Sequence, residues 1–275
     1  MKGKPKVLNT HGSLLGYKKY LPRNQHAPYK LYDALTFKAS AKKANAVVVS
    51  SKLEYEDAVE FGISKKKLHV IPMGVDVDEY VDSPVHRNND MINILFVGRI
   101  ARVRRIEILL QAVAKLSIPF HVTLVGGEEK TASLSRWGYL DELKKLCKTL
   151  NISDRITFAG PVAQDELSTW YRKADIFVYP SLYENFGQPI LEAAAEGLPV
   201  VSTDVGVAKE IVNDGETGFI VPADPGIICE RITQFNDHKT RRLFGEKIQT
   251  QVKKGYDWRT IIKSYIEIYK SFYHS

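Results

Sequence analysis

Runs of about four to six apolar residues alternate along the chain with stretches in which apolar residues recur every three or four positions. Such short runs are typical of buried strands, and the longer period is typical of amphipathic helices. Their alternation predicts an α/β fold with doubly wound parallel sheets. Strands are predicted at 7–10, 46–50, 69–72, 93–97, 120–125, 156–158, 176–179, 199–202 and 218–221. Helices are predicted at about 28–44, 52–61, 106–116, 140–150, 166–173, 189–196 and 257–275.

The spacing of these strands predicts one complete domain and part of another. Six strands lie between residues 92 and 225, which is the usual size of a doubly wound sheet, and three precede residue 75. We therefore expect a partial Rossmann-like domain over 1–75, a linker over 76–91 and a complete Rossmann-like domain over 92–256. The aromatic-rich helix at 257–275 is expected to pack back on the N-terminal part.

Composition excludes several classes of protein. The 275 residues are 44% hydrophobic and 26% charged, which suits a folded core. No apolar run is long enough to span a membrane, and the first residues do not form a signal peptide. The two cysteines, Cys147 and Cys229, exclude a disulfide framework and a cysteine-based zinc cluster. We therefore expect a cytoplasmic location.

The net charge of +7 is unevenly distributed. Residues 1–70 carry a net charge of +9, residues 71–238 carry −8, and residues 239–275 carry +6. The basic N-terminal region interleaves lysines with aromatic residues at 17–20 and 29–32, which suits an anionic membrane surface. A solvated, lysine-rich face is the alternative. No nucleic-acid-binding motif is present. We expect a protein that attaches peripherally to the cytoplasmic face of a membrane.

Ligands of doubly wound sheets bind beyond the carboxyl ends of the strands, so candidate chemistry is sought there. Gly98 ends one strand and is followed by four arginines within residues 99–105. Guanidinium groups beside a helix N-terminus favour a phosphate, although a basic surface loop is the alternative. Gly126-Gly127 ends the next strand and either lets a flat ligand approach the backbone or forms a tight turn.

The segment 180–197 carries the most specific signal. Glu184 lies in the loop after a strand, Gly187 and Pro189 precede a helix, and Glu192 lies one turn inside it. A helix N-terminus binds anions, whereas carboxylates accept hydrogen bonds from sugar hydroxyls. Phosphate and polyol recognition in one loop indicate a nucleotide-sugar. A helix cap with a surface glutamate is the alternative.

Metal and hydrolase chemistry receive little support. Asp76-Val77-Asp78 imitates an Asp-x-Asp metal site, but it falls in the linker rather than after a nucleotide-binding strand. The histidines are scattered without ligand spacing, and no nucleophile–base order is recognisable. We expect no metal and no cofactor other than a nucleotide-sugar substrate.

The run from Gly98 to Asp224 resembles the C-terminal domain of the family 4 retaining glycosyltransferases, which have the GT-B fold. Upstream, 11–13, 46–50 and 71–76 resemble the second half of that family's N-terminal domain, whose first part is then expected to be missing. The shared pieces are Gly98-Arg99 with a basic residue five positions later, Val125-Gly126-Gly127, Phe158–Val162, Ala174–Ser181, Glu184-x7-Glu192, Gly197–Val201 and Gly215–Gly218.

This resemblance implies a role for each candidate residue. It assigns the donor diphosphate to Arg99 and Arg104 beside Gly98, and the ribose hydroxyls to Glu192. It implies that Glu184 contacts the donor sugar and that the backbone at Phe186, Gly187 and Gln188 reaches the sugar and the phosphate. It places the base near the backbone of Gly127 and Val162. It also implies that His11 of the other domain faces the cleft near the reacting sugar.

The family usually has lysine where Arg104 stands and glycine where Arg105 stands. The resemblance implies a hexosyltransferase that uses a nucleoside-diphosphate sugar and a glycan or lipid-linked acceptor. A non-catalytic nucleotide-sugar-binding or assembly subunit is the alternative. The expected missing segment leaves three hypotheses: a fragment of a full enzyme, a chain paired with a partner chain that supplies the missing half, or an inactive remnant.

Overall fold

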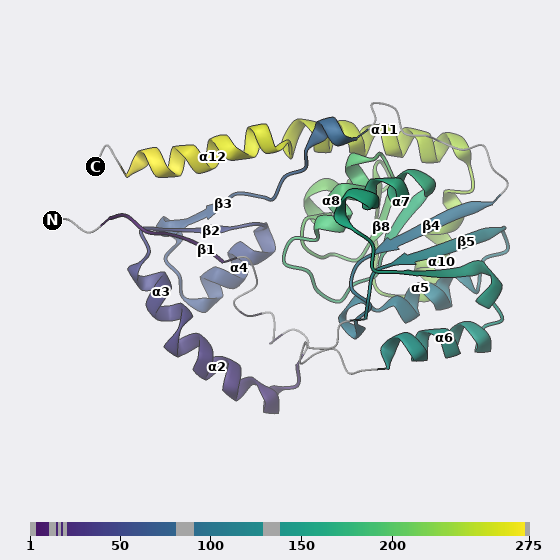
Figure 1. Ribbon diagram of the computed structural model, residues 1–275, viewed down its shortest axis with the longest axis horizontal. Coiled ribbons are helices and arrows are strands. Elements are labelled where there is room, and N and C mark those ends of the chain that lie inside the picture. Colours follow the sequence, from purple (N-terminus) through teal and green to yellow (C-terminus); the bar gives the residue numbers. More distant parts are fainter. Residues whose placement is uncertain are drawn as a thin grey trace. The chain divides into compact units, whose positions relative to one another are not determined.

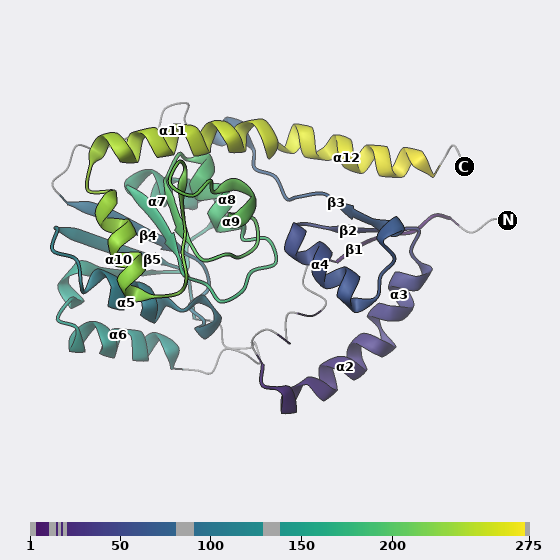
Figure 2. The ribbon, with the colours of Figure 1, turned by 180° about the vertical axis from the view of Figure 1, so that it is seen from behind.

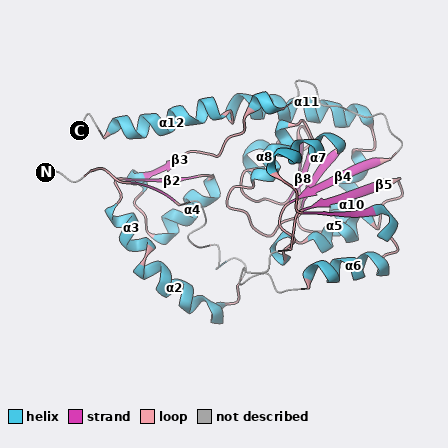
Figure 3. Ribbon diagram, viewed as in Figure 1, coloured by secondary structure: helices cyan, strands magenta, loops and turns pink. Residues whose placement is uncertain are grey.

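The computed structural model describes residues 4–10, 15, 18, 21–80, 91–128 and 138–272 (Figure 1). The chain divides into two compact units. The first comprises Met1–Val75, Tyr183–Phe186 and Gly255–Ser275, and the second comprises Asp76–Leu182 and Gly187–Lys254. Each has its own parallel sheet, drawn in magenta in Figure 3. The predicted α/β class, with one complete doubly wound parallel sheet and a smaller second parallel sheet, is confirmed.

The first unit is built on a three-stranded parallel sheet in the order β1-β2-β3. The strands are β1 (Val7–Asn9), β2 (Ala46–Val49) and β3 (Leu68–Val70). The helices are α2 (His26–Leu35), α3 (Phe37–Lys43), α4 (Lys52–Phe61) and α12 (Trp258–Ser271).

Alternate residues of β2 face two different cores, as the period of a strand requires. Val47 and Val49 belong to the cluster that contains residues of α3 and α4. Ala46 and Val48 belong to the cluster that contains Ile261 and Ile268 of α12. Both faces of β2 are therefore buried, which explains its uninterrupted apolar run.

The start of α12 is fixed by the segment that follows β3. The Val75 N–H donates to the Tyr256 carbonyl at 2.8 Å, and the Trp258 N–H donates to the Val75 carbonyl at 3.1 Å. Gly74 leaves room for the Trp258 ring, because a Cβ at Gly74 would lie 2.8 Å from Trp258 Cδ2. The side chain of Asp257 caps the helix by accepting from the Arg259 N–H.

The second unit is a six-stranded parallel sheet in the order β6-β5-β4-β7-β8-β9. All six strands of this sheet were predicted. They are β4 (Ile92–Val97), β5 (Phe120–Val125), β6 (Ile156–Gly160), β7 (Ile176–Tyr179), β8 (Val200–Ser202) and β9 (Gly218–Ile220). The helices are α5 (Ile106–Val113), α6 (Tyr139–Thr149), α7 (Leu167–Lys173), α8 (Gln188–Ala195), α9 (Ala208–Ile211), α10 (Pro225–Gln234) and α11 (His238–Gly255).

Helices cover both faces of this sheet. Figures 1 and 2 show α5 and α6 on one face and α7 and α8 on the other. Helix α10 returns to the first face and packs against α5. This change of face accompanies the crossover from β6 to β7 and defines a doubly wound sheet.

Three local predictions differ from the structure. The helix expected at 28–44 is divided into α2 and α3 at Thr36, whose hydroxyl donates to the Tyr32 carbonyl at 2.7 Å and so competes with the helical pattern. Pro189 occupies the second position of α8 rather than the first. Helices α9, α10 and α11 were not assigned from the sequence.

The weak signal of α11 has a physical cause. Its buried stripe has only three large apolar residues, Phe244, Ile248 and Val252, and it also includes Arg241 and Gln249. These polar side chains are satisfied by carbonyls: Arg241 donates to Phe235 at 2.6 Å, and Gln249 donates to Ala195 at 2.8 Å. Tertiary hydrogen bonds therefore replace part of the apolar periodicity on which the prediction relied.

Arg105 has a left-handed backbone, with φ 48° and ψ 42°, immediately before α5. A side chain in this conformation costs about 1–2 kcal/mol relative to glycine, which adopts it without strain.

We predict that Arg105→Gly raises the free energy of unfolding by about 0.5–1 kcal/mol, since relief of the strain exceeds the entropy that glycine adds to the unfolded chain. Chemical denaturation measures this change. Asn151→Gly is the matched control: Asn151 is also left-handed, with φ 56°, but asparagine tolerates this region. An Arg105→Gly variant no more stable than the wild type would contradict the prediction.

Candidate donor-binding site at the carboxyl ends of the second sheet

The second sheet has its switch point between β4 and β7. These two strands pair in parallel, with Ile94 opposite Ile176 and Leu95 opposite Phe177. The chain leaves β4 toward one face of the sheet and leaves β7 toward the other, which opens a crevice beyond their carboxyl ends. The loop 98–105 follows β4 and the loop 180–187 follows β7, so the two segments with the strongest predicted chemistry leave neighbouring strands.

Backbone hydrogen bonds join the two loops at this point. The Leu182 N–H donates to the Val103 carbonyl at 2.7 Å. The Ser181 hydroxyl donates to the same carbonyl at 3.1 Å. The position of the loop after β4 is therefore set by the first residues after β7.

Arg104 is turned into this junction. It is only 7% exposed, and its Nη1 donates to the Ser181 hydroxyl at 3.2 Å. Its guanidinium carbon lies 5.8 Å from the centroid of the Tyr179 ring, which is itself stacked on Phe96. The aromatic rings and Ser181 thus hold a buried positive charge at the switch point.

The other arginines of this loop have different surroundings. Arg99 is exposed. Arg102 forms an ion pair with Glu142 and lies over the Tyr139 ring, with 5.2 Å between its Cζ and the centroid. The four arginines therefore do not form one cluster: Arg104 is built into the site, whereas Arg102 is engaged with α6.

The N-terminus of α5 does not offer the anion site that was expected from its position beside the arginines. The Tyr139 hydroxyl accepts from the N–H of Ile106 at 2.9 Å and from that of Glu107 at 3.4 Å, and it donates to the Glu107 carboxylate. Burial raises the pKa of Tyr139, and its hydrogen bond to Glu107 raises it further. The first donors of this helix are thus occupied by an internal cap.

Gly126 and Gly127 have different roles. Gly126 has φ 140°, and a Cβ there would lie 1.9 Å from the Gly98 carbonyl oxygen, so no other residue fits. Gly127 is less crowded, because a Cβ there would lie 3.6 Å from Pro161 at ordinary contact distance. Gly126 is therefore required for packing of the loops, whereas the fold itself does not require glycine at 127.

Glu192 is a buried carboxylate, 6% exposed, on α8. Its Oε2 accepts from the Tyr171 hydroxyl at 2.9 Å, and its Oε1 accepts from Gln164 Nε2 at 3.4 Å. Burial raises the pKa of Glu192, while the hydrogen bonds from Tyr171 and Gln164 partly oppose the rise. This carboxylate is thus fixed in orientation and can accept further hydrogen bonds.

Glu192 lines a cavity of about 570 Å³. Tyr80 also lines it, and burial, with a contribution from Glu192, raises the pKa of Tyr80. This volume suits a small ligand with several hydroxyl groups. The described residues that line the cavity are Glu79, Tyr80, Gln164, Asp165, Leu167, Ser168, Tyr171 and Glu192.

The loop that carries Glu184 is described with the first unit. The Ser51 hydroxyl accepts from the Glu54 N–H at 3.1 Å and so caps α4. The same hydroxyl donates to the Asn185 carbonyl at 2.6 Å, which attaches the loop 183–186 to the start of this helix. The Tyr183 hydroxyl contacts Asp57 at 3.2 Å. Phe186 is buried, and Glu184 is half-buried.

The predicted residues are therefore distributed as follows. Gly98, Arg104 and Gly127 lie beyond the carboxyl ends of β4 and β5, and Arg99, which follows Gly98, is exposed. Val162 follows β6 and is half-buried, while Gly187 and Gln188 begin α8. Glu184 and Phe186 are described with the first unit. His11 lies outside the residues that the structure describes.

Several supporting residues were not found from the sequence. Tyr171 and Gln164 orient Glu192, and Tyr179 and Ser181 hold Arg104. The sequence around a tyrosine or a glutamine does not show that it orients another side chain, because this role depends on a partner distant in sequence. Asp76 has a local role: its carboxylate accepts from the Asp78 N–H and caps a short turn. No group of three metal-ligating side chains occurs in the ranges that the structure describes.

Comparison with known proteins identifies the family. The model of the glycosyl transferases group 1 matches residues 80–251, and that of glycosyltransferase family 4 matches residues 1–79. The chain therefore belongs to the glycosyl transferases group 1 family. The predicted family is thus confirmed.

Individual relatives agree with this assignment. The D-inositol 3-phosphate glycosyltransferase of Corynebacterium urealyticum is 29% identical over 245 residues, which cover 83% of this chain and 57% of the relative. Sucrose-phosphate synthase from Thermosynechococcus elongatus has a TM-score of 0.82 at 28% identity, covering 98% of this chain and 68% of that one. The structure of HepE from Anabaena in complex with UDP-glucose has a TM-score of 0.80 at 21% identity, covering 98% and 72%.

These likenesses establish the GT-B fold. The chain spans somewhat more than half the length of the curated relatives that it matches. None of the helices in the described ranges is both long and apolar enough to cross a bilayer.

We predict that Gly127→Ala leaves the free energy of unfolding within about 1 kcal/mol of the wild type but weakens nucleotide binding, since the new Cβ occupies space where the base is expected. Calorimetric titration with UDP and thermal denaturation measure the two effects. Gly126→Ala is the control: it should be strongly destabilised by its clash with Gly98. Unchanged UDP affinity in a folded Gly127→Ala variant would remove Gly127 from the site.

We predict that Glu192→Gln changes the pH dependence of stability. Because the folded-state pKa of Glu192 is raised above 4.5, the native state retains this proton longer than the unfolded chain, and its contribution to stability is lost as pH rises through the folded pKa. Glutamine does not titrate, so the stability of the variant relative to the wild type should increase from pH 4.5 upward.

Denaturation from pH 4 to 8 measures this effect, with Glu142→Gln as control. The ion pair with Arg102 lowers the pKa of Glu142, so the stability of that variant relative to the wild type should fall as pH rises. Equal pH profiles for Glu192→Gln and the wild type would contradict the prediction.

Proposed function

We propose that this chain is the donor-binding part of a retaining glycosyltransferase. The reaction moves a hexose from a nucleoside-diphosphate sugar to a glycan or lipid-linked acceptor. The observation that carries this proposal is the buried Glu192 carboxylate, oriented by Tyr171 and Gln164 and lining a cavity of about 570 Å³. A buried carboxylate with remaining acceptor capacity suits paired ribose hydroxyls.

Arg104 supports the proposal that the donor carries a diphosphate. Its buried guanidinium at the switch point, together with exposed Arg99, places positive charge where the donor diphosphate would leave. Charge fixed in advance stabilises a developing anion without the cost of reorganisation. The proposal therefore assigns neutralisation of the leaving diphosphate to these two arginines.

In the proposed reaction the acceptor hydroxyl attacks the anomeric carbon from the face that the diphosphate leaves. The bond from that carbon to the diphosphate oxygen breaks, the bond to the acceptor oxygen forms, and the hydroxyl proton passes to the leaving oxygen. The anomeric configuration is retained, and no covalent enzyme intermediate forms. Glu184 and the backbone at Phe186, Gly187 and Gln188 would contact the sugar, and His11 would face the reacting centre.

Relatives support a UDP-linked donor. The solved HepE structures contain UDP-glucose, or UDP with glucose, and curated relatives are named D-inositol 3-phosphate glycosyltransferases. We propose UDP-glucose as the first donor to test, with GDP-mannose as the comparison. The net positive charge of residues 1–70 and 239–275 supports an anionic acceptor or an anionic membrane surface on the acceptor side.

We predict that the wild-type chain binds one of these donors and that Glu192→Ala weakens the affinity by about 1–3 kcal/mol, because hydrogen bonds to a charged acceptor are lost. Calorimetric titration measures this, and a transfer and hydrolysis assay measures turnover. Glu196→Ala is the matched control: Glu196 is a buried carboxylate at the C-cap of α8 that pairs with Arg172 at 3.1 Å and does not line the cavity.

The outcomes separate the two functions that were considered. Binding with turnover supports the transferase, and binding without turnover supports a nucleotide-sugar-binding subunit. Loss of affinity that is equal in Glu192→Ala and Glu196→Ala would contradict the role given to Glu192.

A further inference from the structure

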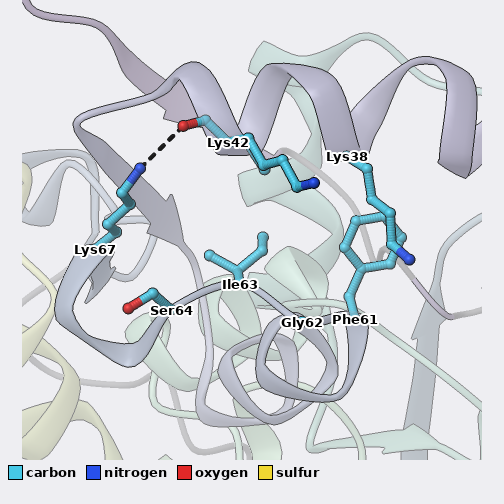
Figure 4. Close-up of a pocket in the computed structure, with 8 residues that line it drawn as sticks. Lys38, Lys42, Phe61, Gly62, Ile63, Ser64 and Lys67 are labelled. Atoms are coloured by element: carbon cyan, nitrogen blue, oxygen red, sulfur yellow. Dashed lines mark hydrogen bonds between the residues drawn. The ribbon is translucent and has the colours of Figure 1, made fainter.

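A second cavity of the first unit has a wall of lysines. Its volume is about 360 Å³, and it lies at the amino ends of β2 and β3, because α3 ends just before β2 and Lys67 immediately precedes β3 (Figure 4). The described residues that line it are Lys38, Ala41, Lys42, Phe61, Gly62, Ile63, Ser64 and Lys67. Three of these side chains are cationic, and none is acidic.

The floor of the cavity is apolar. Ala41, Phe61 and Ile63 are buried members of the core cluster beneath α3 and α4. In Figure 4 Ile63 lies between Lys67 and Lys38, and Ser64 adds one hydroxyl group to the lining. A ligand that fits this surface carries a negative charge and tolerates an apolar contact beside it.

The ammonium group of Lys67 is held in place by the end of α3. Its Nζ donates to the Ala44 carbonyl at 2.7 Å and to the Lys42 carbonyl at 3.1 Å. These carbonyls belong to the last turn of the helix, where backbone acceptors lack helical partners. Lys67 therefore contributes a fixed positive charge.

Lys38 and Lys42 are one turn apart on α3, so their like charges share one face of the helix. Like charges four residues apart destabilise a helix unless an anion compensates them. Lys38 Nζ lies 5.9 Å from the centroid of the Phe61 ring. No ion pair links these three lysines to a carboxylate within the described ranges, in contrast to Lys18, which pairs with Glu60 at 2.8 Å.

We propose that this cavity binds the phosphate group of a phosphate ester. Lysines from two separate segments, α3 and the residue before β3, line one cavity, and lysine suits phosphate as a compact point charge. The adjoining apolar floor accommodates the carbon atoms next to the phosphate. The site lies at the opposite ends of the strands from Ser50 and Ser51, which follow β2, so it does not depend on the proposed glycosyltransferase function.

The phosphate ester has two sources that the experiment distinguishes. One is a soluble phosphorylated compound, and the other is a phospholipid headgroup. Helix α2, which precedes α3, exposes Leu35 and Leu31, at 70% and 62%, and these side chains could enter a bilayer surface. The soluble probe is phenyl phosphate, and the lipid probe is a phosphatidylcholine vesicle with or without phosphatidylglycerol.

The test compares two double variants of the first unit, each of which removes two positive charges. Lys38→Gln/Lys42→Gln removes the two lysines of the cavity wall and leaves the capping Lys67 intact. Lys43→Gln/Lys65→Gln is the control, because both lysines are exposed and neither lines the cavity. Ser64→Glu is a third variant, which introduces a competing carboxylate without removing a lysine.

We expect Lys38→Gln/Lys42→Gln and Ser64→Glu each to bind one of the two probes, phenyl phosphate or the phosphatidylglycerol vesicle, at least tenfold more weakly than the wild type. The affinity of the control variant for the same probe should change by no more than twofold. Loss in the phenyl phosphate titration identifies a soluble ligand, and loss only in vesicle flotation identifies a headgroup. Equal loss in both double variants, or no binding of either probe by the wild type, overturns the proposal. Circular dichroism establishes that the variants are folded, and unchanged UDP affinity separates this site from the donor site.

Discussion

The parallel pairing of β4 with β7 is the constraint on which the second unit depends. It places two loops that are about 80 residues apart in sequence at one sheet edge, where Ser181 and Leu182 bind the Val103 carbonyl. Arg104 is buried only because this junction supplies a hydroxyl group and an aromatic ring for it. Without the pairing, a guanidinium at this depth would face an uncompensated cost of desolvation.

The loop contacts also explain why glycine is required where it is. Parallel pairing continues past the strand ends, with Gly98 donating to Val125 and Gly126 donating to Gly160. The three backbones then approach more closely than side chains permit, and Gly126 meets Gly98 directly. The sequence left ligand approach and a tight turn as alternatives for Gly126-Gly127, and at Gly126 the approaching group is the chain itself.

The number and the positions of the strands could be predicted because buried parallel strands are continuous apolar runs, as in β7 and β2. The candidate loops followed from the rule that ligands bind at strand ends. Residues that act through a distant partner could not be predicted in the same way. Tyr171 orients Glu192 from another helix, and Tyr139 caps α5 from α6. Neither pairing leaves a periodic or local trace, and Arg241 and Gln249 even obscure the period of α11.

Because both faces of β2 are buried, its hydrophobic pattern alone does not fix the register in which it pairs with β1 and β3. All four residues of the strand are apolar, so a slip of one position would exchange its faces at little cost in burial. Polar groups at its two ends oppose such a slip. Asn45 exchanges hydrogen bonds with the backbone of Lys6 at one end, and Glu54 accepts from the Ser50 N–H at the other. In this sheet the apolar residues stabilise the fold, whereas a few hydrogen bonds at the ends of β2 specify a single register.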